Sequence, residues 1–164
     1  MNKWILGARP RTLPAAVTPV VVSVAIAYPV FNFINALLAL IVGLALQIAV
    51  NYANDYSDGI KGTDMERIGP TRLVASGLAS AEEVKQAAIL AFGIGGVAGL
   101  YLSIRTSYWL IAIGAAAIIA AWRYTGGKNP YGYRGLGEVY VFIFFGLVAT
   151  IGTYYGQTGQ VGIE

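Results

Sequence analysis

The residues of this sequence with the most evident chemistry lie in one short segment, residues 51–64. Asn51, Asn54, Asp55 and Asp58 are spaced i, i+3, i+4 and i+7, which predicts that they share one face of a helix. Carboxylate and amide oxygens suit Mg²⁺ or Ca²⁺ better than zinc or copper. Mg²⁺ is commonly held by one or two carboxylates together with substrate phosphates, so the segment predicts a site for a diphosphate-bearing substrate.

Two glycines follow these side chains, and they are expected to end the helix. Gly59 and Gly62 allow the chain to turn and to bring Asp64 back towards the same site. A simpler interpretation is that the polar residues only cap a helix at a membrane surface. Acidic side chains oppose the helix dipole at a C-terminus, however, so Lys or Gly is the expected residue for such a cap.

Basic side chains follow the acidic segment directly. Lys61, Arg67 and Arg72 are candidates for gripping phosphate, because Lys and Arg are its usual partners in proteins. The alternative is that they only mark the cytoplasmic side of a membrane protein, where Lys and Arg are enriched. Both interpretations remain open at this point.

A second polar loop, residues 124–138, is rich in aromatic and basic residues. It contains Tyr124, Tyr131, Tyr133, Lys128 and Arg134. The tyrosines either form an ordinary aromatic belt at a membrane surface or line a site in which their ring faces stabilise a cation.

Composition indicates the elements that must position these residues. The 164 residues are 57% hydrophobic and only 12% charged, whereas a soluble domain carries about 25% charge. The sequence therefore belongs to the membrane class. It contains neither cysteine nor histidine, which excludes thiol chemistry and the commonest general base. The basic residues are spread over separate loops, which favours anionic lipid or a phosphorylated substrate over nucleic acid as the partner.

Apolar segments predict an all-α bundle of about five membrane spans. They cover residues 14–28, 35–54, 81–104, 108–124 and 139–155. With the N-terminus in the cytoplasm, Arg105 is the one basic residue outside, so ten of the eleven Lys and Arg residues lie inside. Both polar loops then face the cytoplasm. Residues 80–83, Ser-Ala-Glu-Glu, predict a capping box at the start of the third span.

Four blocks of sequence, taken together, resemble one known family. They are Ala-Arg-Pro-Arg-Thr-Leu-Pro at 8–14, the acidic segment, Arg-Ile-Gly-Pro-Thr-Arg-Leu-Val-Ala-Ser-Gly at 67–77, and the stretch 130–146 that begins Pro-Tyr-Gly-Tyr-Arg-Gly-Leu-Gly-Glu. The sequence is similar to the UbiA superfamily of intramembrane aromatic prenyltransferases, and most similar to its branch that prenylates 1,4-dihydroxy-2-naphthoate in menaquinone synthesis.

The resemblance implies a reaction. A polyprenyl diphosphate binds through Mg²⁺, the diphosphate leaves, and the electron-rich ring of 1,4-dihydroxy-2-naphthoate attacks the allylic cation with loss of CO₂. It also implies a multi-pass protein of a prokaryotic plasma membrane, in contact with membrane lipid and with its active site towards the cytoplasm. A related aromatic acceptor, as in phytyl transfer to a phylloquinone precursor, is an alternative.

The resemblance further implies roles for individual residues. The family's first acidic motif reads Asn-Asp-x-x-Asp-x-x-x-Asp, and Asn54, Asp55 and Asp58 match its first part. Its last Asp falls on Gly62 here, and Asp64 is the nearest carboxylate. The implied metal ligands are Asn54, Asp55, Asp58 and Asp64. The implied diphosphate-binding residues are Asn51, Arg67, Arg72 and Lys128. The implied catalytic residues are Lys61, Tyr131 and Arg134.

A departure from the family concerns its second acidic motif. All three Asp residues lie in the first motif region, so residues 1–164 are expected to be the N-terminal part of a single transmembrane prenyltransferase domain that is inactive alone. Two other functions stay open. A transporter with a cation site is disfavoured because its acidic residues usually lie near the bilayer midplane. The other is a structural membrane subunit without chemistry, which does not explain why the acidic and amide residues share one helix face.

Overall fold

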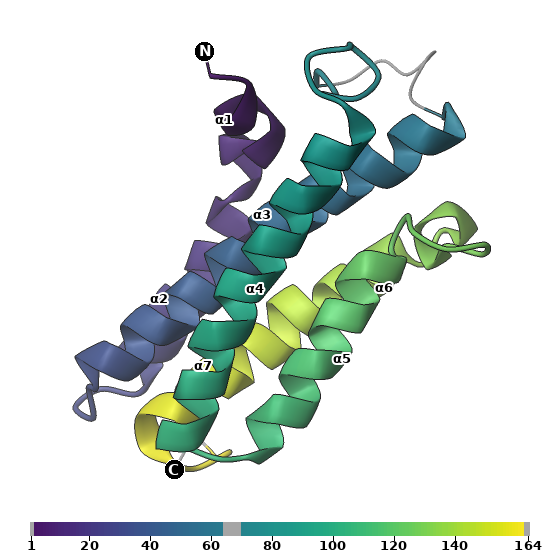
Figure 1. Ribbon diagram of the computed structural model, residues 1–164. Coiled ribbons are helices and arrows are strands. Elements are labelled where there is room, and N and C mark those ends of the chain that lie inside the picture. Colours follow the sequence, from purple (N-terminus) through teal and green to yellow (C-terminus); the bar gives the residue numbers. More distant parts are fainter. Residues whose placement is uncertain (1, 64–69, 163–164) are drawn as a thin grey trace.

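The computed structural model describes residues 2–63 and 70–162 as a bundle of helices, with no strand among them (Figure 1). The elements in chain order are α1 (Lys3–Ala8), the 3₁₀ turn η1 (Pro10–Thr12), α2 (Pro14–Ile26), α3 (Phe33–Lys61), α4 (Ala81–Arg105), α5 (Trp109–Arg123), the 3₁₀ turn η2 (Tyr131–Arg134), α6 (Gly137–Val141), the π-helical segment η3 (Phe142–Val148) and α7 (Ala149–Thr158). The predicted all-α class is confirmed.

Three helices are long and apolar enough to cross a membrane. They are Phe33–Lys61, Ala81–Arg105 and the combined α6–η3–α7 helix, Gly137–Thr158. The two shorter apolar helices, α2 and α5, have 13 and 15 residues. At 1.5 Å per residue they are shorter than the apolar core of a bilayer, which is about 30 Å thick. Their large apolar side chains, such as Val21 and Ile119, are nevertheless exposed on the outside of the bundle, as in helices that face lipid.

Helix α3 extends further than the sequence predicts. It continues through Gly59 and ends at Gly62, which adopts the left-handed conformation with φ 69°. Gly59 serves close packing instead: a Cβ there would lie 2.5 Å from Cγ1 of Val74. The acidic segment is therefore helical up to Lys61, and residues 73 and 74 lie directly against its last turns.

Helix α4 begins as predicted and packs along α3. Ser80 and Glu83 form the capping box, with Ser80 N donating to Glu83 Oε2 at 2.8 Å and Glu83 N donating to Ser80 Oγ at 3.2 Å. Figure 1 shows the two helices side by side over most of their length. Gly95 permits this approach, since a Cβ there would meet the Ala45 Cβ at 3.3 Å.

The C-terminal helix is not a regular α-helix. Between α6 and α7, seven residues are π-helical, with wider turns whose hydrogen bonds run from residue i to i+5. A row of residues four apart drifts by about 40° per step around an α-helix. The wider turns offset this drift, so Tyr140, Phe144, Val148 and Thr153 all line the same interior space.

Candidate active site

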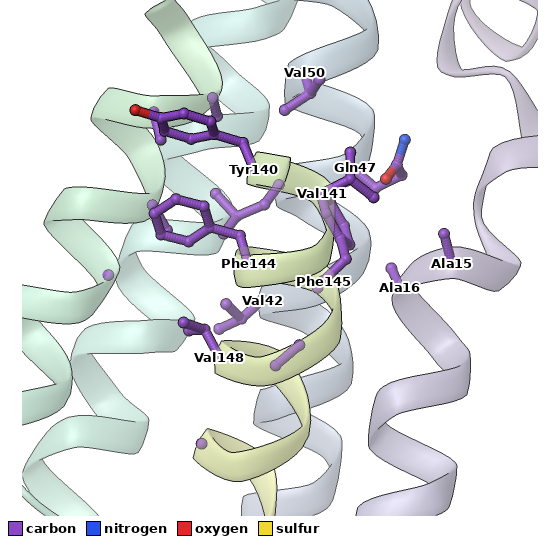
Figure 2. A pocket seen from close by; sticks show the side chains of 18 of the residues that line it. Ala15, Ala16, Val42, Gln47, Val50, Tyr140, Val141, Phe144, Phe145 and Val148 are labelled. Atoms are coloured by element: carbon purple, nitrogen blue, oxygen red, sulfur yellow. The ribbon is translucent and has the colours of Figure 1, made fainter. Parts of the chain in front are cut away.

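A cavity of about 540 Å³ lies inside the bundle between α2, α3, α4, α5 and the C-terminal helix. Figure 2 shows Tyr140, Phe144 and Val148 one above the other on the same side of their helix within the cavity wall. Most of the lining is aliphatic or aromatic. The polar lining residues gather where α3 approaches the two polar loops, and include Arg11, Thr12, Gln47, Asn51, Asn54, Tyr124 and Tyr131. The cavity thus has a polar end and a long apolar remainder.

The two asparagines of the predicted site line the polar end and are buried. Asn51 Nδ2 donates to the carbonyl of Ala8 and to Thr12 Oγ1, both at 2.9 Å. Asn54 Oδ1 accepts a hydrogen bond from Thr125 Oγ1 at 2.8 Å. Asn51 therefore joins α3 to the N-terminal segment, and Asn54 joins it to the loop after α5.

Asp55 and Asp58 are also buried, but they face the chain that follows α3. Asp55 is 0% exposed, and its two oxygens accept hydrogen bonds from the backbone N–H groups of Leu73, at 2.8 Å, and Val74, at 3.1 Å. Asp58 pairs with side chains instead. Its Oδ2 lies 3.3 Å from Arg72 Nη2, and its Oδ1 accepts a hydrogen bond from the hydroxyl of Tyr133.

Lys61 brings the second polar loop onto the end of α3. Its Nζ donates to the carbonyl of Thr125 and lies 5.1 Å from the centre of the Tyr133 ring. Since Tyr133 also contacts Asp58, one loop residue bridges an acidic and a basic side chain of α3. The two polar loops, distant in sequence, therefore meet over the last turns of one helix.

A group of aromatic rings borders the polar end of the cavity. Tyr131 stacks on Tyr140 with 3.8 Å between ring centres, and Tyr124 meets Tyr131 edge-on at 5.5 Å. The Tyr131 hydroxyl donates to the carbonyl of Ala120 at 2.9 Å. The pKa of Tyr131 is raised to about 12, mainly by burial and to a smaller extent by the neighbouring Tyr140 and Tyr124. The phenol therefore stays neutral at physiological pH, and its ring face lines the cavity.

The remaining predicted residues divide into two groups. Lys128 and Arg134 are exposed, and neither forms an ion pair or hydrogen bond with the described part of the chain. Asp64 and Arg67 lie outside the described residues. The geometry thus joins Asp58, Lys61 and Arg72 in one network and places Asn51, Asn54 and Tyr131 along the cavity.

Sequence reasoning assigned no role to Thr125, and it considered Tyr133 only as an aromatic ring of a belt or a site wall, not as a partner of Asp58. Thr125 bonds Asn54 and Lys61, and Tyr133 bonds Asp58. The only signal for them was the concentration of tyrosine, glycine and basic residues in the second polar loop. Tyr140 was also missed, because it appeared to belong to an ordinary membrane span.

The donor atoms at this site suit a hard divalent cation. Residues 2–63 and 70–162 contain no group of three or more His, Cys, Asp or Glu side chains able to hold a metal by themselves. Asn54 and Asp58 offer an amide oxygen and a carboxylate at the junction of the cavity and the loops. Such a small oxygen set fits Mg²⁺, which takes few protein ligands and completes its shell with phosphate and water.

Comparison with known proteins identifies the family. Residues 16–164 match the UbiA prenyltransferase family. A relative named 1,4-dihydroxy-2-naphthoate octaprenyltransferase from Mycobacterium tuberculosis is 53% identical over 161 residues, which cover 97% of this chain and 55% of the relative. The relative of the same name from Escherichia coli is 40% identical over 163 residues, 94% of this chain and 53% of the relative.

The chain thus spans about half the length of the curated relatives it matches. No solved structure matches it. The family match covers well over half of the chain and agrees with the resemblance of the four sequence blocks. The chain belongs to the UbiA prenyltransferase family.

Proposed function

We propose that this chain contributes the diphosphate-binding half of an intramembrane site that transfers a polyprenyl group to 1,4-dihydroxy-2-naphthoate. Residues 1–164 are then part of a single transmembrane prenyltransferase domain. The observation that carries the proposal is the cavity, which is polar where Asn51 and Asn54 line it and mostly apolar over the rest of its length. A polyprenyl diphosphate has the same division between a charged head and an apolar tail.

The last turns of α3, which follow the cavity-lining residues Asn51 and Asn54, supply further groups for the diphosphate head. Arg72 pairs with Asp58 directly, and Lys61 joins the same network through the Thr125 carbonyl and the ring of Tyr133. Anionic phosphate oxygens prefer such donors, and Arg offers several N–H groups in a fixed fork. Lys128, Arg134, Arg67 and the Asn51 amide are further candidates that the bound diphosphate is expected to engage.

Asn54 and Asp58 are the proposed ligands of Mg²⁺, together with Asp64. When bound there, Mg²⁺ neutralises charge on the departing diphosphate. Asp58 currently bonds Arg72 and Tyr133, both through side chains that are able to rotate. Asp55 is also buried, and both of its oxygens accept hydrogen bonds from backbone amides.

The apolar remainder of the cavity suits the prenyl tail and protects the cation. Phe144, Phe145 and Val148 line it and exclude water. Tyr131 and Tyr140 present stacked ring faces beside the polar end, where the C–O bond of the allylic diphosphate breaks. Aromatic faces attract cations. Ring attack on the allylic carbon forms the new C–C bond, and the naphthoate carboxylate leaves as CO₂ with its electron pair returned to the ring.

We also propose that the protein lies in a prokaryotic plasma membrane with the polar end of the cavity towards the cytoplasm. The distribution of Lys and Arg supports this orientation, since Arg105 is the one basic residue of the described part of the chain that lies at the other end of the bundle.

The proposal is tested with a chimera, in which residues 1–164 are joined to the part of the M. tuberculosis relative that the alignment leaves uncovered. Membranes containing the chimera are supplied with Mg²⁺, a polyprenyl diphosphate and 1,4-dihydroxy-2-naphthoate. We expect the prenylated naphthalenediol, pyrophosphate and CO₂ in equal amounts. A folded, membrane-inserted chimera that forms no product, while the parent relative does so in parallel, contradicts the proposed function.

A further inference from the structure

Two carboxylates one helical turn apart on α3 have different kinds of partner. Asp58 contacts the side chains of Arg72 and Tyr133. Asp55 contacts two consecutive backbone N–H groups, those of Leu73 and Val74. Side chains can rotate away when a ligand arrives, whereas backbone amides within a packed segment cannot. The two carboxylates therefore differ in function if the segment that contains Leu73 and Val74 is fixed, and the packing of that segment shows whether it is.

The segment after Arg72 is firmly packed. Leu73 is 0% exposed and lies against Gly7 of α1, where a Cβ would come within 2.6 Å of Leu73 Cδ1. Val74 lies against Gly59, where a Cβ would come within 2.5 Å. Two glycines on different helices thus leave room for two neighbouring side chains. Displacing the Leu73 and Val74 amides from Asp55 would require moving both side chains out of these contacts.

The hydrogen bonds from the Leu73 and Val74 amides to Asp55 also restrain the residue before them, Arg72. The Leu73 N–H belongs to the peptide bond that joins Arg72 to Leu73, so its bond to Asp55 fixes the backbone from which the Arg72 side chain starts. The Arg72 side chain is 10% exposed and reaches Asp58 Oδ2 at 3.3 Å. A long side chain that starts from a fixed backbone loses less conformational entropy when it binds a ligand.

We infer that Asp55 is a positioning residue for Arg72 rather than a metal ligand. It holds the 72–74 backbone so that the Arg72 guanidinium stands beside Asp58, where the diphosphate binds. The carboxylate suits this task because both of its oxygens accept N–H bonds, and bonds to a charged acceptor are stronger than neutral ones. This inference rests on the proposed function, because it assumes that Arg72 binds the diphosphate.

The test compares the same substitution at the two positions, Asp55→Asn and Asp58→Asn, in the 164-residue chain in detergent micelles. An Asn side chain offers one acceptor oxygen, so Asp55→Asn loses one of the two N–H bonds. Backbone hydrogen exchange at Leu73 and Val74 is expected to accelerate at least about tenfold in Asp55→Asn, because the amides open more often. Asp58→Asn is expected to leave exchange at these two amides unchanged.

Binding of inorganic pyrophosphate, titrated at several Mg²⁺ concentrations, separates positioning from metal ligation. Asp55→Asn and Arg72→Gln are each expected to weaken pyrophosphate binding about tenfold. The double variant is expected to bind no worse than Arg72→Gln alone, since Asp55 acts through Arg72. Asp58→Asn is expected to raise the Mg²⁺ concentration needed for half-maximal binding, and Asp55→Asn is not.

Three results overturn the inference. They are a raised Mg²⁺ requirement in Asp55→Asn that matches that of Asp58→Asn, additive effects in the double variant, and no binding of pyrophosphate by the unsubstituted chain. These measurements need no prenyl transfer. A chimera that makes no product while the chain binds pyrophosphate as expected therefore contradicts the proposed function and leaves the role of Asp55 intact.

Discussion

Buried polar residues occur at both ends of the bundle, and their partners differ. At the end where α7 stops, Asn35 Nδ2 donates to the carbonyl of Gly156 at 2.7 Å, and Ser23 Oγ donates to the carbonyl of Thr150 at 2.7 Å. At the opposite end, in the last turns of α3, Asp58 pairs with the side chains of Arg72 and Tyr133.

This difference in partners distinguishes polar residues that hold helices together from polar residues that are available to bind a ligand. A side chain bonded to the backbone of another helix holds that helix in place, because an unpaired polar group inside an apolar bundle is costly. Side chains bonded to one another can exchange partners for a ligand without moving a helix. By this criterion Ser23 and Asn35 fasten α7 to α2 and α3, and the group of Asp58, Arg72 and Tyr133 is the part of the other end that suits binding. Asp55, which bonds backbone at the polar end, belongs with the fastening residues.

The strongest test of this contrast removes Asp58, the carboxylate whose side-chain partners can be exchanged for a ligand. Asp58→Ala in the chimera is expected to lower turnover by about 100-fold or more, because an electrostatic partner at the reacting group is lost. Membrane insertion is expected to be unchanged. Product formation is followed at saturating Mg²⁺ with insertion measured by membrane fractionation. Near-normal turnover would count against a metal role for Asp58.

The opposite pattern is expected at the far end. Asn35→Ala removes the bond to Gly156 and the bond that Arg105 Nε donates to Asn35 Oδ1 at 2.9 Å. The free energy of unfolding is expected to fall by about 1–3 kcal/mol, because buried groups are left unpaired. The kcat/KM of the chimera is expected to stay close to its unsubstituted value. A large loss of kcat/KM with unchanged stability would abolish the distinction between the two ends.

A smaller effect is expected from changing Tyr133, which contacts Asp58 and Lys61 from the second polar loop. Tyr133→Phe keeps the ring that lies over Lys61 and removes the hydroxyl that donates to Asp58. Loss of one hydrogen bond to a charged group is expected to reduce kcat/KM about tenfold at most, if the partner is exchangeable. Tyr133→Ala, which also removes the ring, serves as the comparison. Equal loss in both variants would show that the ring contributes nothing.

The smallest effect concerns pH. The pKa of Tyr131 is raised from 10.0 to about 12, so the folded state favours the neutral phenol. This contribution to stability is fully present below pH 10 and is lost as the pH rises towards about 12, because the unfolded chain releases the proton first. Tyr131→Phe is expected to weaken the decline in stability across that range. Thermal unfolding at stepped pH measures it, and an unchanged decline would contradict the raised pKa.

Much of this arrangement could be predicted from the sequence. Apolar runs located the five helices, and the spacing of Asn51, Asn54, Asp55 and Asp58 indicated that they belong to one helix. Such patterns are local, and the helical repeat fixes them without knowledge of the rest of the chain. The sequence did not show that Gly59 lies inside the helix, because its purpose, contact with Val74, depends on a segment fifteen residues away.

The partners of the acidic residues could not be predicted for a related reason. Spacing places Asp55 and Asp58 on neighbouring turns, but it does not show what each one faces. That depends on how the chain after Lys61 folds back and on where the loop after α5 docks. Thr125 and Tyr133 reach α3 from about seventy residues further along the chain, and no local pattern marks such contacts.

The π-helical segment η3 has a consequence for changes in chain length. A π turn contains an extra residue relative to an α turn, so it behaves as an insertion that the helix has already absorbed. Deleting one residue between Phe142 and Val148 would restore ordinary α turns and leave the flanking residues, Tyr140 and Thr153, in phase with the cavity. The same deletion within α7 would rotate everything beyond it by about 100°. Length variation in this helix is therefore tolerated in one place and disruptive in the next turn.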